Sequence, residues 1–449
     1  MSARVTVIGG GLAGCEAAWQ AALRGAQVTL YEMRPTVQTG AHKTSHLAEL
    51  VCSNSLRALA LENAVGLLKE ELKRFGSIIV EAAHAAAVPA GGALAVDREL
   101  FSGWIEERIA AHPRIEVRRE EVRVLDTDHV AVVACGPLAS EALGAELARL
   151  CGRPHLHYYD AASPIVAADS IDHTQVFAAS RYGKGGADYL NVPLTRDQYY
   201  ELVSDLVNSE KHEPHGFEDD LQRGKAPFFE GCLPVEEMAR RGEDTLRFGP
   251  LKPVGLSESA PGGRRPYAVV QLRRENAAGT AYNLVGFQTR LTWPAQKAAF
   301  GKLPGLGQAE WIRLGVMHRN TFVDAPRVLA PDLSLHAHPA IFLAGQVSGC
   351  EGYVEASATG FIAGINAVRR AQQREAFVPP NITALGSLIA YLQDTTSEDF
   401  QPQSVSFAYI APLEPRVADK RARRQMIAAR SLAYVEAVKA ELCELVAAS

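Results

Sequence analysis

Short apolar runs and amphipathic stretches alternate at the start of the chain. Arg4–Ile8 and Gln27–Glu32 are rich in β-branched and apolar residues, which predicts two buried strands. Between them, Leu12–Arg24 carries apolar residues at helical spacing, and Gly25 follows where a glycine commonly ends a helix. A strand, a helix and a second strand within about 30 residues predict a βαβ unit with parallel strands.

The same periodicities predict further elements in the first third of the chain. Ala64–Phe75 and Asp97–Ala111 have the spacing of amphipathic helices, and Asp97 is expected to be the N-cap of the second. We expect Ile115–Arg118 and Val122–Leu125 to be short strands that form a hairpin. His129–Ala134 is a further apolar run and predicts another buried strand.

From about residue 155 the composition changes. Tyr, Pro and Gly become frequent, and charged segments such as Lys211–Lys225 lie between strand-like runs, for example Ala268–Leu272 and Asn283–Phe287. We therefore expect residues 155–315 to form an inserted domain of mixed α/β type. Residues 1–154 and 316–449 would then make up one discontinuous domain.

The α/β pattern returns after the insertion. Ile341–Ala344 predicts a short strand, and a helix is expected over about Thr359–Ala371. The tail from Glu414 is predicted to be helical and is basic, with Arg416, Lys420, Arg421, Arg423, Arg424 and Arg430.

A glycine pattern at the first strand–helix junction indicates a dinucleotide site. Gly9, Gly11 and Gly14 form G-x-G-x-x-G directly after a predicted strand and at the start of a predicted helix. Phosphate groups bind at such a helix N-terminus because its free N–H groups and its dipole favour negative charge. Glu32 ends the second strand, where an acid can bind a ribose hydroxyl. The expected cofactor contacts are Gly9, Gly10, Gly11, Leu12, Ala13, Gly14 and Glu32.

Features later in the chain favour FAD over NAD as the bound dinucleotide. The strand Ile341–Ala344, Gly345-Gln346 and the expected helix start at Thr359-Gly360 resemble the closing FAD motif of glutathione-reductase-like flavoproteins. Val132–Gly136 resembles the middle motif of the same group. The predicted fold class is therefore α/β, a doubly wound FAD-binding Rossmann domain of this type with an inserted mixed α/β domain. Gly345, Gln346, Thr359 and Gly360 join the expected cofactor residues.

Composition restricts the partners and the compartment. The net charge is −5, so an RNA site would have to be a local patch of Lys and Arg. The seven cysteines include no C-x-x-C pair, which argues against a disulfide framework and a Cys-rich metal site and favours the reducing cytoplasm. No apolar run approaches the roughly 18 residues of a membrane helix, so no membrane association is expected.

Two cysteines have settings that suit chemistry. Cys52 is followed by Ser53, Asn54 and Ser55, small polar residues that often start a helix, and a helix N-terminus stabilises a thiolate. Cys232 lies in a loop-like segment between Gly231 and Pro234. Spacing alone leaves open that either cysteine is an inert buried side chain.

Around these cysteines the sequence resembles the bacterial folate- and FAD-dependent tRNA (uracil-5-)-methyltransferases. The matching segments run along nearly the whole chain, and several are long and unusual in composition. They are Gly9–Gly14, Tyr31–Pro35, Glu49–Leu56, Val88–Arg98, Tyr158–Pro164, Asp188–Asn191, Phe248–Gly255, Gly286–Thr289, Val316–Thr321 and Glu351–Gly360. Cys350 and Ala356 depart from the expected Val and Ser.

The resemblance implies formation of 5-methyluridine in the T loop of tRNA. It implies that 5,10-methylenetetrahydrofolate supplies the carbon, that reduced FAD supplies the electrons, and that NADH or NADPH reduces the flavin without a dinucleotide fingerprint of its own. C5 of uracil becomes reactive when a thiolate adds to C6, and a second group must remove the C5 proton. Cys52 is assigned as the nucleophile and Cys232 as the acid/base partner, with the reverse assignment left open.

Further ligand contacts follow from the matching segments. His318, Asn320 and Tyr353 are candidate folate contacts. Arg264, Arg265, Arg273 and Arg274 are candidate tRNA contacts, as are the C-terminal arginines, although a run of charge is also typical of an exposed solvated face.

Three other functions are compatible with parts of the pattern. A related flavoenzyme that modifies the wobble uridine of tRNA shares the FAD domain and the use of folate, but it is longer and has an extra helical C-terminal domain. A flavin oxidoreductase acting on a small metabolite would give Cys52 and Cys232 no role. A non-catalytic RNA-binding protein would give the FAD motifs no role.

Overall fold

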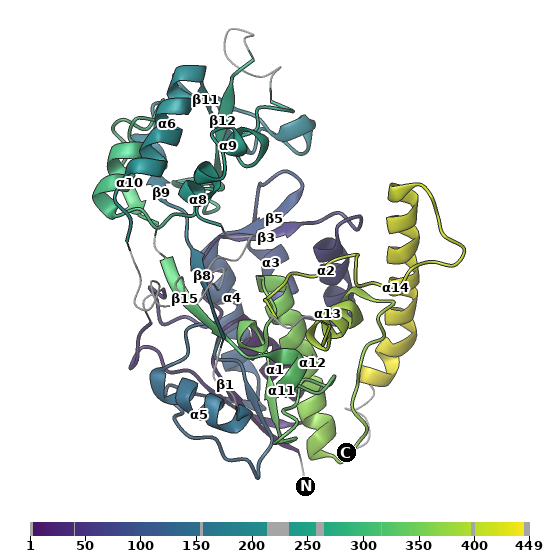
Figure 1. Cartoon of the computed structure of the whole chain (residues 1–449). Helices are drawn as coiled ribbons and strands as arrows, with labels where there is room; N and C mark the ends of the chain where they lie inside the picture. The colour runs from purple at the N-terminus through teal and green to yellow at the C-terminus, as the bar shows by residue number, and fades with distance from the viewer. Residues whose placement is uncertain are drawn as a thin grey trace.

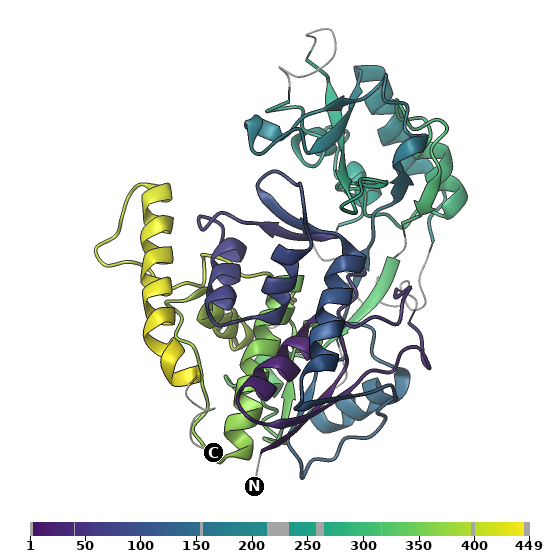
Figure 2. The ribbon, with the colours of Figure 1, turned by 180° about the vertical axis from the view of Figure 1, so that it is seen from behind.

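The computed structural model describes residues 3–39, 41–152, 156–212, 233–256, 265–315, 317–396 and 400–443. Two lobes of unequal size are visible in Figure 1. Two antiparallel strands, β8 (Leu156–Ala161) and β15 (Met317–Phe322), run between the lobes. The view from behind in Figure 2 shows the same division.

The larger lobe contains a five-stranded parallel sheet in the order β16-β7-β1-β2-β6. Its strands are β1 (Arg4–Ile8), β2 (Gln27–Tyr31), β6 (Ile115–Arg118), β7 (Ala131–Val133) and β16 (Ile341–Leu343). The predicted βαβ unit is confirmed, because β1 pairs in parallel with β2 and α1 (Leu12–Leu23) connects them.

The predicted hairpin is wrong. Ile115–Arg118 pairs in parallel with β2 at the edge of the sheet, and Val122–Leu125 is not a strand. The backbone hydrogen bonds of β6 are therefore supplied by a strand more than 80 residues earlier in the chain, which a local pattern does not reveal.

Helix α12 (Tyr353–Ala371) packs tightly against α1 in the centre of this lobe. A Cβ atom on Gly360 would lie 2.2 Å from the carbonyl oxygen of Ala13, and one on Gly364 would lie 2.5 Å from that of Ala17. The helix was expected to begin at Thr359, but it begins six residues earlier. Gly360 therefore serves close helix packing in the middle of α12 rather than a helix start.

Further helices and a small sheet complete the larger lobe. The helices are α2 (Ala64–Arg74), α3 (Ile78–Ala85), α4 (Arg98–Ala111), α5 (Glu141–Cys151), α11 (Ala325–Val328), α13 (Ala384–Leu392) and α14 (Lys420–Cys443). The small antiparallel sheet has the order β3 (Ser55–Ala58), β5 (Ala93–Val96) and β4 (Ala87–Val88). Asp97 is the N-cap of α4 as predicted, since its carboxylate accepts hydrogen bonds from the backbone N–H groups of Glu99 and Leu100.

The smaller lobe is built on a six-stranded antiparallel sheet in the order β10-β11-β12-β13-β9-β14. The strands are β9 (Ile165–Ala167), β10 (Phe177–Ala178), β11 (Tyr189–Leu194), β12 (Ala268–Arg274), β13 (Ala281–Leu284) and β14 (Trp311–Arg313). Helices α6 (Arg196–Asn208), α8 (Val235–Arg240), α9 (Thr245–Phe248) and α10 (Trp293–Phe300) accompany this sheet.

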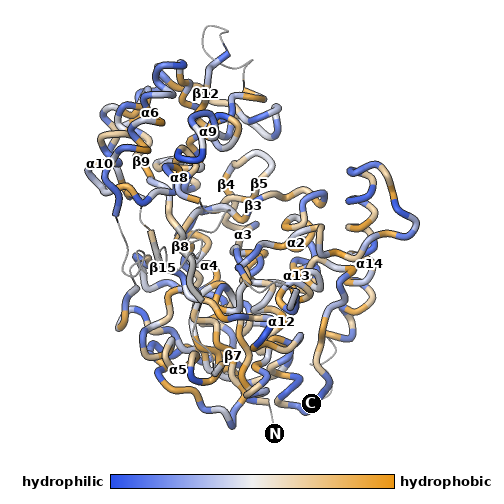
Figure 3. The backbone as a smooth tube through the Cα atoms, in the orientation of Figure 1, coloured by the Kyte–Doolittle hydropathy of each residue, from blue (hydrophilic) through white to orange (hydrophobic). Residues whose placement is uncertain are grey.

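Each lobe has its own hydrophobic core. One cluster of buried side chains joins the parallel sheet to α1, α2, α3, α4 and α12, and a second joins the antiparallel sheet to α6, α8 and α10. In Figure 3 the hydrophobic residues gather inside each lobe, while the outer turns are hydrophilic. No helix in the described part of the chain is long and apolar enough to cross a membrane.

The α1–α12 contact leads to a stability prediction. Gly360→Ala should lower the free energy of unfolding by about 1–3 kcal/mol, because the added methyl group has no room against α1. Gly103→Ala in α4 is the matched control, because a Cβ at this position would have nothing within 4 Å. This substitution should stabilise the helix by about 0.5–1 kcal/mol. Urea unfolding of both variants measures the difference, and equal effects of the two substitutions would contradict this account of the packing.

A second prediction concerns pH. Burial raises the pKa of Glu16 on α1 to about 7, although Ser77, Gln20 and the N–H of Ile79 donate hydrogen bonds to its carboxylate. Because this pKa is raised, the folded state binds more protons than the unfolded chain between about pH 4.5 and 7, and stability falls as the pH rises through that window. The expected contribution is at most about 1.4 kcal/mol per pH unit.

Glu16→Gln should remove this contribution. Thermal unfolding at pH 5 and at pH 7.5 should show a smaller loss of Tm with rising pH in the variant than in the unmodified chain. The same loss of Tm in both proteins would show that Glu16 does not titrate in this range.

Candidate active site

A cavity of about 470 Å³ lies between the parallel sheet and the smaller lobe, within the usual size range of ligand pockets. The turn after β1 and the end of β16 form one part of its lining, and the segment around Cys52 forms another. Strand β13 and the turn that follows it contribute a third part from the smaller lobe. The lining includes Gly9, Gly11, Ala13, Glu32, Cys52, Ala134, Gly136, Arg273, Asn283, Asn320, Gly345, Gln346 and Tyr353.

The glycine turn has the geometry that a pyrophosphate requires. Gly9 has φ of +105°, a conformation that other residues rarely adopt, and a Cβ on Gly14 would lie 1.7 Å from the Gly9 carbonyl oxygen. A Cβ on Gly11 would meet nothing within 4 Å, so the backbone is open towards the cavity. No side chain caps the N-terminus of α1, and its first N–H groups remain available to an anion.

Glu32 stands at the end of β2 and lines the same cavity. Its carboxylate accepts hydrogen bonds from the N–H of Gly10 at 2.8 Å and from Nε of Arg34 at 2.8 Å. Burial acts to raise the pKa of Glu32, but the hydrogen bonds and the positive charge of Arg34 outweigh it and hold the pKa below its usual value. The carboxylate therefore stays ionised and keeps lone pairs for a ribose hydroxyl.

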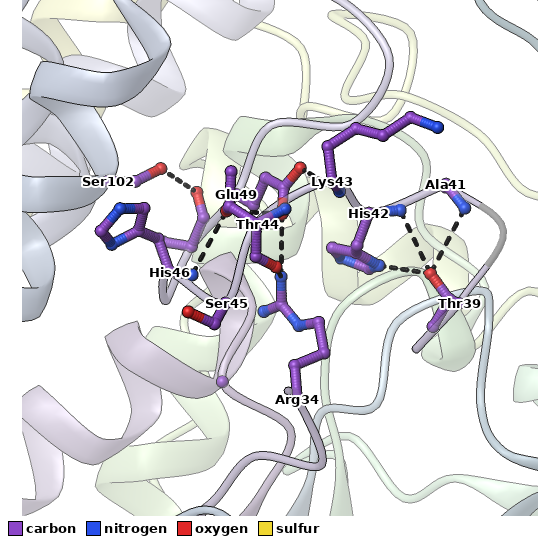
Figure 4. A network of polar contacts seen from close by, with 12 residues as sticks. Arg34, Thr39, Ala41, His42, Lys43, Thr44, Ser45, His46, Glu49 and Ser102 are labelled. Atoms are coloured by element: carbon purple, nitrogen blue, oxygen red, sulfur yellow. Dashed lines mark hydrogen bonds and ion pairs between the residues drawn. The ribbon is translucent and has the colours of Figure 1, made fainter. Parts of the chain in front are cut away.

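Arg34 also connects the end of β2 to the loop that follows it, as Figure 4 shows. Its Nη1 lies 3.0 Å from Oε2 of Glu49, and that carboxylate accepts hydrogen bonds from the N–H groups of Lys43 and Thr44. The loop carries Ala41 and His42, which also line the cavity. Two carboxylates on one guanidinium thus hold the loop against the end of β2.

The four residues of the expected closing FAD motif have two different positions. Two of them line the cavity, and the other two lie behind it. Gly345 and Gln346 line the cavity at the end of β16, whereas Thr359 and Gly360 are buried and do not appear in its lining. Oγ1 of Thr359 accepts a hydrogen bond from the N–H of Gly345 at 2.8 Å. Thr359 and Gly360 therefore position the turn rather than face the cavity. Gly10 and Gly14 likewise lie outside the lining.

The half-buried Cys52 lies at another part of the cavity, on an irregular segment before strand β3 rather than at a helix start. The expectation of a helix after Cys52 is wrong, because Ser55–Ala58 pairs with β5 as strand β3. The N–H groups of Cys52 and Ser53 donate to the phenol oxygen of Tyr353, at 2.8 and 3.1 Å. Burial and the nearby charge of Cys52 raise the pKa of Tyr353, so its phenol keeps its proton.

Arginines supply the positive charge that a helix N-terminus was expected to provide. Arg98 donates to the carbonyl oxygens of Leu50 and Cys52, and Arg313 donates to that of Val51 at 2.6 Å. Nε of Arg273 donates to Oδ1 of Asn54 at 3.0 Å. All three guanidinium groups also interact electrostatically with Cys52. Positive charge beside a cysteine favours the thiolate, the form that acts as a nucleophile or as a base.

Burial acts to lower the pKa of all three guanidinium groups, but the net result differs. It lowers the pKa of Arg273 and of Arg313. Burial also acts to lower the pKa of Arg98, but the carboxylate of Glu275 outweighs it and raises that pKa. Nε of Arg98 lies 2.7 Å from Oε2 of Glu275. This ion pair joins Glu275, the residue that follows β12 in the smaller lobe, to the start of α4 in the larger one.

Some of the other predicted site residues line the cavity, and some lie outside the described part of the chain. Asn320 and Tyr353 line the cavity with Cys52. Cys232, Arg264 and the side chain of His318 lie outside the described residues. Arg265 is exposed and Arg274 is half-buried, whereas Arg273 is 8% exposed and lines the cavity.

Arg98, Arg313 and Asn283 were not singled out from the sequence as site residues. They lie far apart in the chain and meet only in the folded structure, so no local pattern marks them. In the described part of the chain, no group of three or more His, Cys, Asp and Glu residues could hold a metal ion.

The fold and the glycine turn define a dinucleotide-binding α/β protein. The family model of glucose inhibited division protein A matches residues 4–375. The chain is 55% identical over 437 residues to the methylenetetrahydrofolate--tRNA-(uracil-5-)-methyltransferase TrmFO of Geobacter sulfurreducens, covering 97% of this chain and 99% of that relative. It is 52% identical over 432 residues to the protein of the same name from Moorella thermoacetica, covering 96% of this chain and 97% of that relative.

A solved structure shares the fold. GidA of Aquifex aeolicus superposes with a TM-score of 0.71 at 17% identity, covering 100% of this chain and 74% of that one. The chain therefore belongs to the GidA family and, among its members, to the methylenetetrahydrofolate--tRNA-(uracil-5-)-methyltransferases. The family resemblance and the α/β fold class predicted from the sequence are confirmed.

The arginines around Cys52 lead to a prediction about its reactivity. Arg313→Gln should slow alkylation of Cys52 by iodoacetamide at pH 7 by about 3- to 10-fold, because the thiolate loses a neighbouring positive charge. Mass spectrometry of the Cys52 peptide measures the rate, and Arg421→Gln on the exposed face of α14 is the control. The alkylation rate at pH 10 reports access to Cys52 alone. If Arg313→Gln leaves the ratio of the rates at pH 7 and pH 10 unchanged, the electrostatic role of Arg313 is contradicted.

Proposed function

We propose that this chain methylates C5 of a uridine in the T loop of tRNA. The carbon comes from 5,10-methylenetetrahydrofolate, the electrons come from reduced FAD, and NADH or NADPH reduces the flavin. The observation that carries the proposal is the single cavity that joins the glycine turn after β1 to Cys52. The printed name of the relatives supports it, since it gives the folate, the tRNA and the uracil position.

The residues of the cavity fit FAD. The open backbone at Gly11 and the free N–H groups of α1 suit the pyrophosphate, and the ionised Glu32 suits a ribose hydroxyl. Gly345 and Gln346 at the end of β16 line the same cavity as Cys52. When bound, FAD and methylenetetrahydrofolate supply the electrons and the one-carbon unit of the reaction.

The protein must activate C5 and remove its proton. A thiolate that adds to C6 of uracil moves electron density onto C5, which then reacts with the one-carbon unit. A second group takes the C5 proton, after which the thiolate leaves C6 and the ring becomes aromatic again. We assign these two roles to Cys52 and Cys232, and the charge around Cys52 suits it for either role because both require a thiolate.

Folate and tRNA also have candidate contacts among the predicted residues. Asn320 and Tyr353 line the cavity and are proposed, with His318, to hold the folate. The exposed Arg265 and the half-buried Arg274 are proposed to meet tRNA phosphates together with Arg264, as are the arginines of the C-terminal tail. The burial of Arg273 favours a role at the cavity instead.

The organisation and the compartment complete the proposal. Residues 1–154 and 316–449 are proposed as the FAD domain and residues 155–315 as the inserted domain that covers the uridine end of the cavity. The separate hydrophobic cores support this division. The cytoplasm is proposed as the location, because it holds the substrate tRNA and keeps the cysteines reduced.

Two other functions are less well supported. A wobble-uridine modifying flavoprotein would share the FAD domain, but the relatives of 52–55% identity carry the name of the uracil-5-methyltransferases. A flavin oxidoreductase acting on a small metabolite would leave the arginine cluster at Cys52 without a role.

The test is an assay with transcribed tRNA, methylenetetrahydrofolate, FAD and NADPH or NADH. Digestion of the RNA and mass spectrometry should find 5-methyluridine in the T-loop fragment. Cys52→Ala and Cys232→Ala should each lower the rate by at least about 1000-fold, because each removes a group needed for bond making or proton transfer.

Cys151→Ala is the matched control, since Cys151 is a free cysteine at the end of α5 that does not line the cavity. It should leave the rate unchanged. Product in the anticodon fragment would favour the wobble-uridine function. Flavin turnover without any modified nucleoside would favour the small-molecule oxidoreductase.

A further inference from the structure

One face of the antiparallel sheet carries a row of cross-strand neighbours opposite Cys52. Arg273 on β12 pairs with Asn283 on β13, Asn283 pairs with Ile165 on β9, and Ile165 pairs with Arg313 on β14. Directly opposed residues in antiparallel strands project to the same side of the sheet. Arg273, Asn283, Ile165 and Arg313 therefore share one face.

The two arginines of this row touch the Cys52 segment on either side of the cysteine. Arg273 donates to the side chain of Asn54, and Arg313 donates to the carbonyl oxygen of Val51. Asn283 lies between these arginines in the row and lines the same cavity as Cys52. Asn283 therefore lies on the cavity side of the sheet.

The side-chain amide of Asn283 is buried without a partner. Asn283 is 2% exposed, and its Nδ2 has no hydrogen-bond partner within the described part of the chain. An unsatisfied buried donor costs free energy, so native structures rarely keep one without a reason. Its neighbours Tyr282 and Leu284 point the other way into the core of the smaller lobe, which an apolar residue at 283 would not disturb.

We propose that the amide of Asn283 binds the imide edge of the target uracil, with Nδ2 donating to O4 and Oδ1 accepting from N3–H. This inference rests on the proposed function. A carboxamide offers one donor and one acceptor side by side, which matches uracil, whereas cytosine presents an amino group and an unprotonated N3. No other cavity-lining carboxamide lies between the two arginines in this row of the described sheet.

The same contact assists the chemistry. When the thiolate adds, an S–C6 bond forms, the C5–C6 π pair moves towards C4, and the negative charge of the thiolate is carried by O4. A donor aimed at O4 stabilises that charge as it develops. No proton leaves the ring in this step, because the C5 proton is removed only after C5 has taken the one-carbon unit.

The test compares Asn283→Ala and Asn283→Asp with the unmodified chain under single-turnover conditions, using tRNA transcripts with U or C at the target position. Asn283→Ala should lower the rate on U by roughly 10- to 100-fold, since two hydrogen bonds are lost. Asn283→Asp replaces the donor by an acceptor, so the ratio of C to U methylation should rise by about tenfold or more. Asn208→Ala, on the exposed side of α6, is the control and should match the unmodified chain.

Two further readouts separate this role from others. The Tm of Asn283→Ala should equal or exceed that of the unmodified chain, because a buried group without a partner is removed. A lowered Tm together with an unchanged C to U ratio in Asn283→Asp would show a structural role and overturn the proposal. The lactam edge of a pterin resembles that of uracil, so the KM for methylenetetrahydrofolate is measured in parallel.

A raised KM for methylenetetrahydrofolate with an unchanged preference for U over C would place the folate at Asn283 and overturn the proposal. A rate on U equal to that of Asn208→Ala would also overturn it. Absence of 5-methyluridine with the unmodified chain would refute the proposed function itself, and this inference with it.

Discussion

The segment from Leu50 to Asn54 is held by guanidinium groups that come from both lobes. A guanidinium removed from water needs hydrogen-bond acceptors, and the backbone carbonyls around Cys52 provide them. Arg98 reaches this segment from the larger lobe, and Arg313 and Arg273 reach it from the smaller one. The position of Cys52, the closure of the cavity and the approach of Asn283 all depend on these contacts.

The same constraint links the cysteine to the cofactor end of the cavity. Tyr353, the first residue of α12, accepts hydrogen bonds from the Cys52 segment, and α12 packs directly on α1 behind the glycine turn. Thr359, six residues further along α12, accepts a hydrogen bond from the N–H of Gly345 at the end of β16. One helix thus sets the spacing between the dinucleotide turn and the reactive thiol. We infer that this spacing is what allows a flavin and a uridine to share one cavity.

The sequence predicts the local features of this arrangement well. The βαβ unit, the glycine turn, Glu32 at the end of β2 and the cap at Asp97 each depend on a few consecutive residues. The features that it does not predict depend on long-range pairing. Ile115–Arg118 has the composition of a hairpin strand, but its hydrogen bonds go to β2.

The sequence does not predict the electrostatic setting of Cys52 either. Three small polar residues after the cysteine suggested a helix, whereas strand β3 forms there because β5, some 40 residues later, supplies its partners. Asn283 resembles any polar residue in a strand until the register places it between Arg273 and Arg313. The family resemblance located the cysteines, but the cross-strand row became visible only in three dimensions.

A crystal structure of the chain with bound FAD would show whether one cavity places the flavin beside Cys52. We expect the pyrophosphate on the N–H groups at Gly11 and Ala13, a ribose hydroxyl on Glu32, and the flavin ring on the Cys52 side of Gly345. A flavin ring turned away from Cys52, or FAD bound outside this cavity, would contradict this expectation.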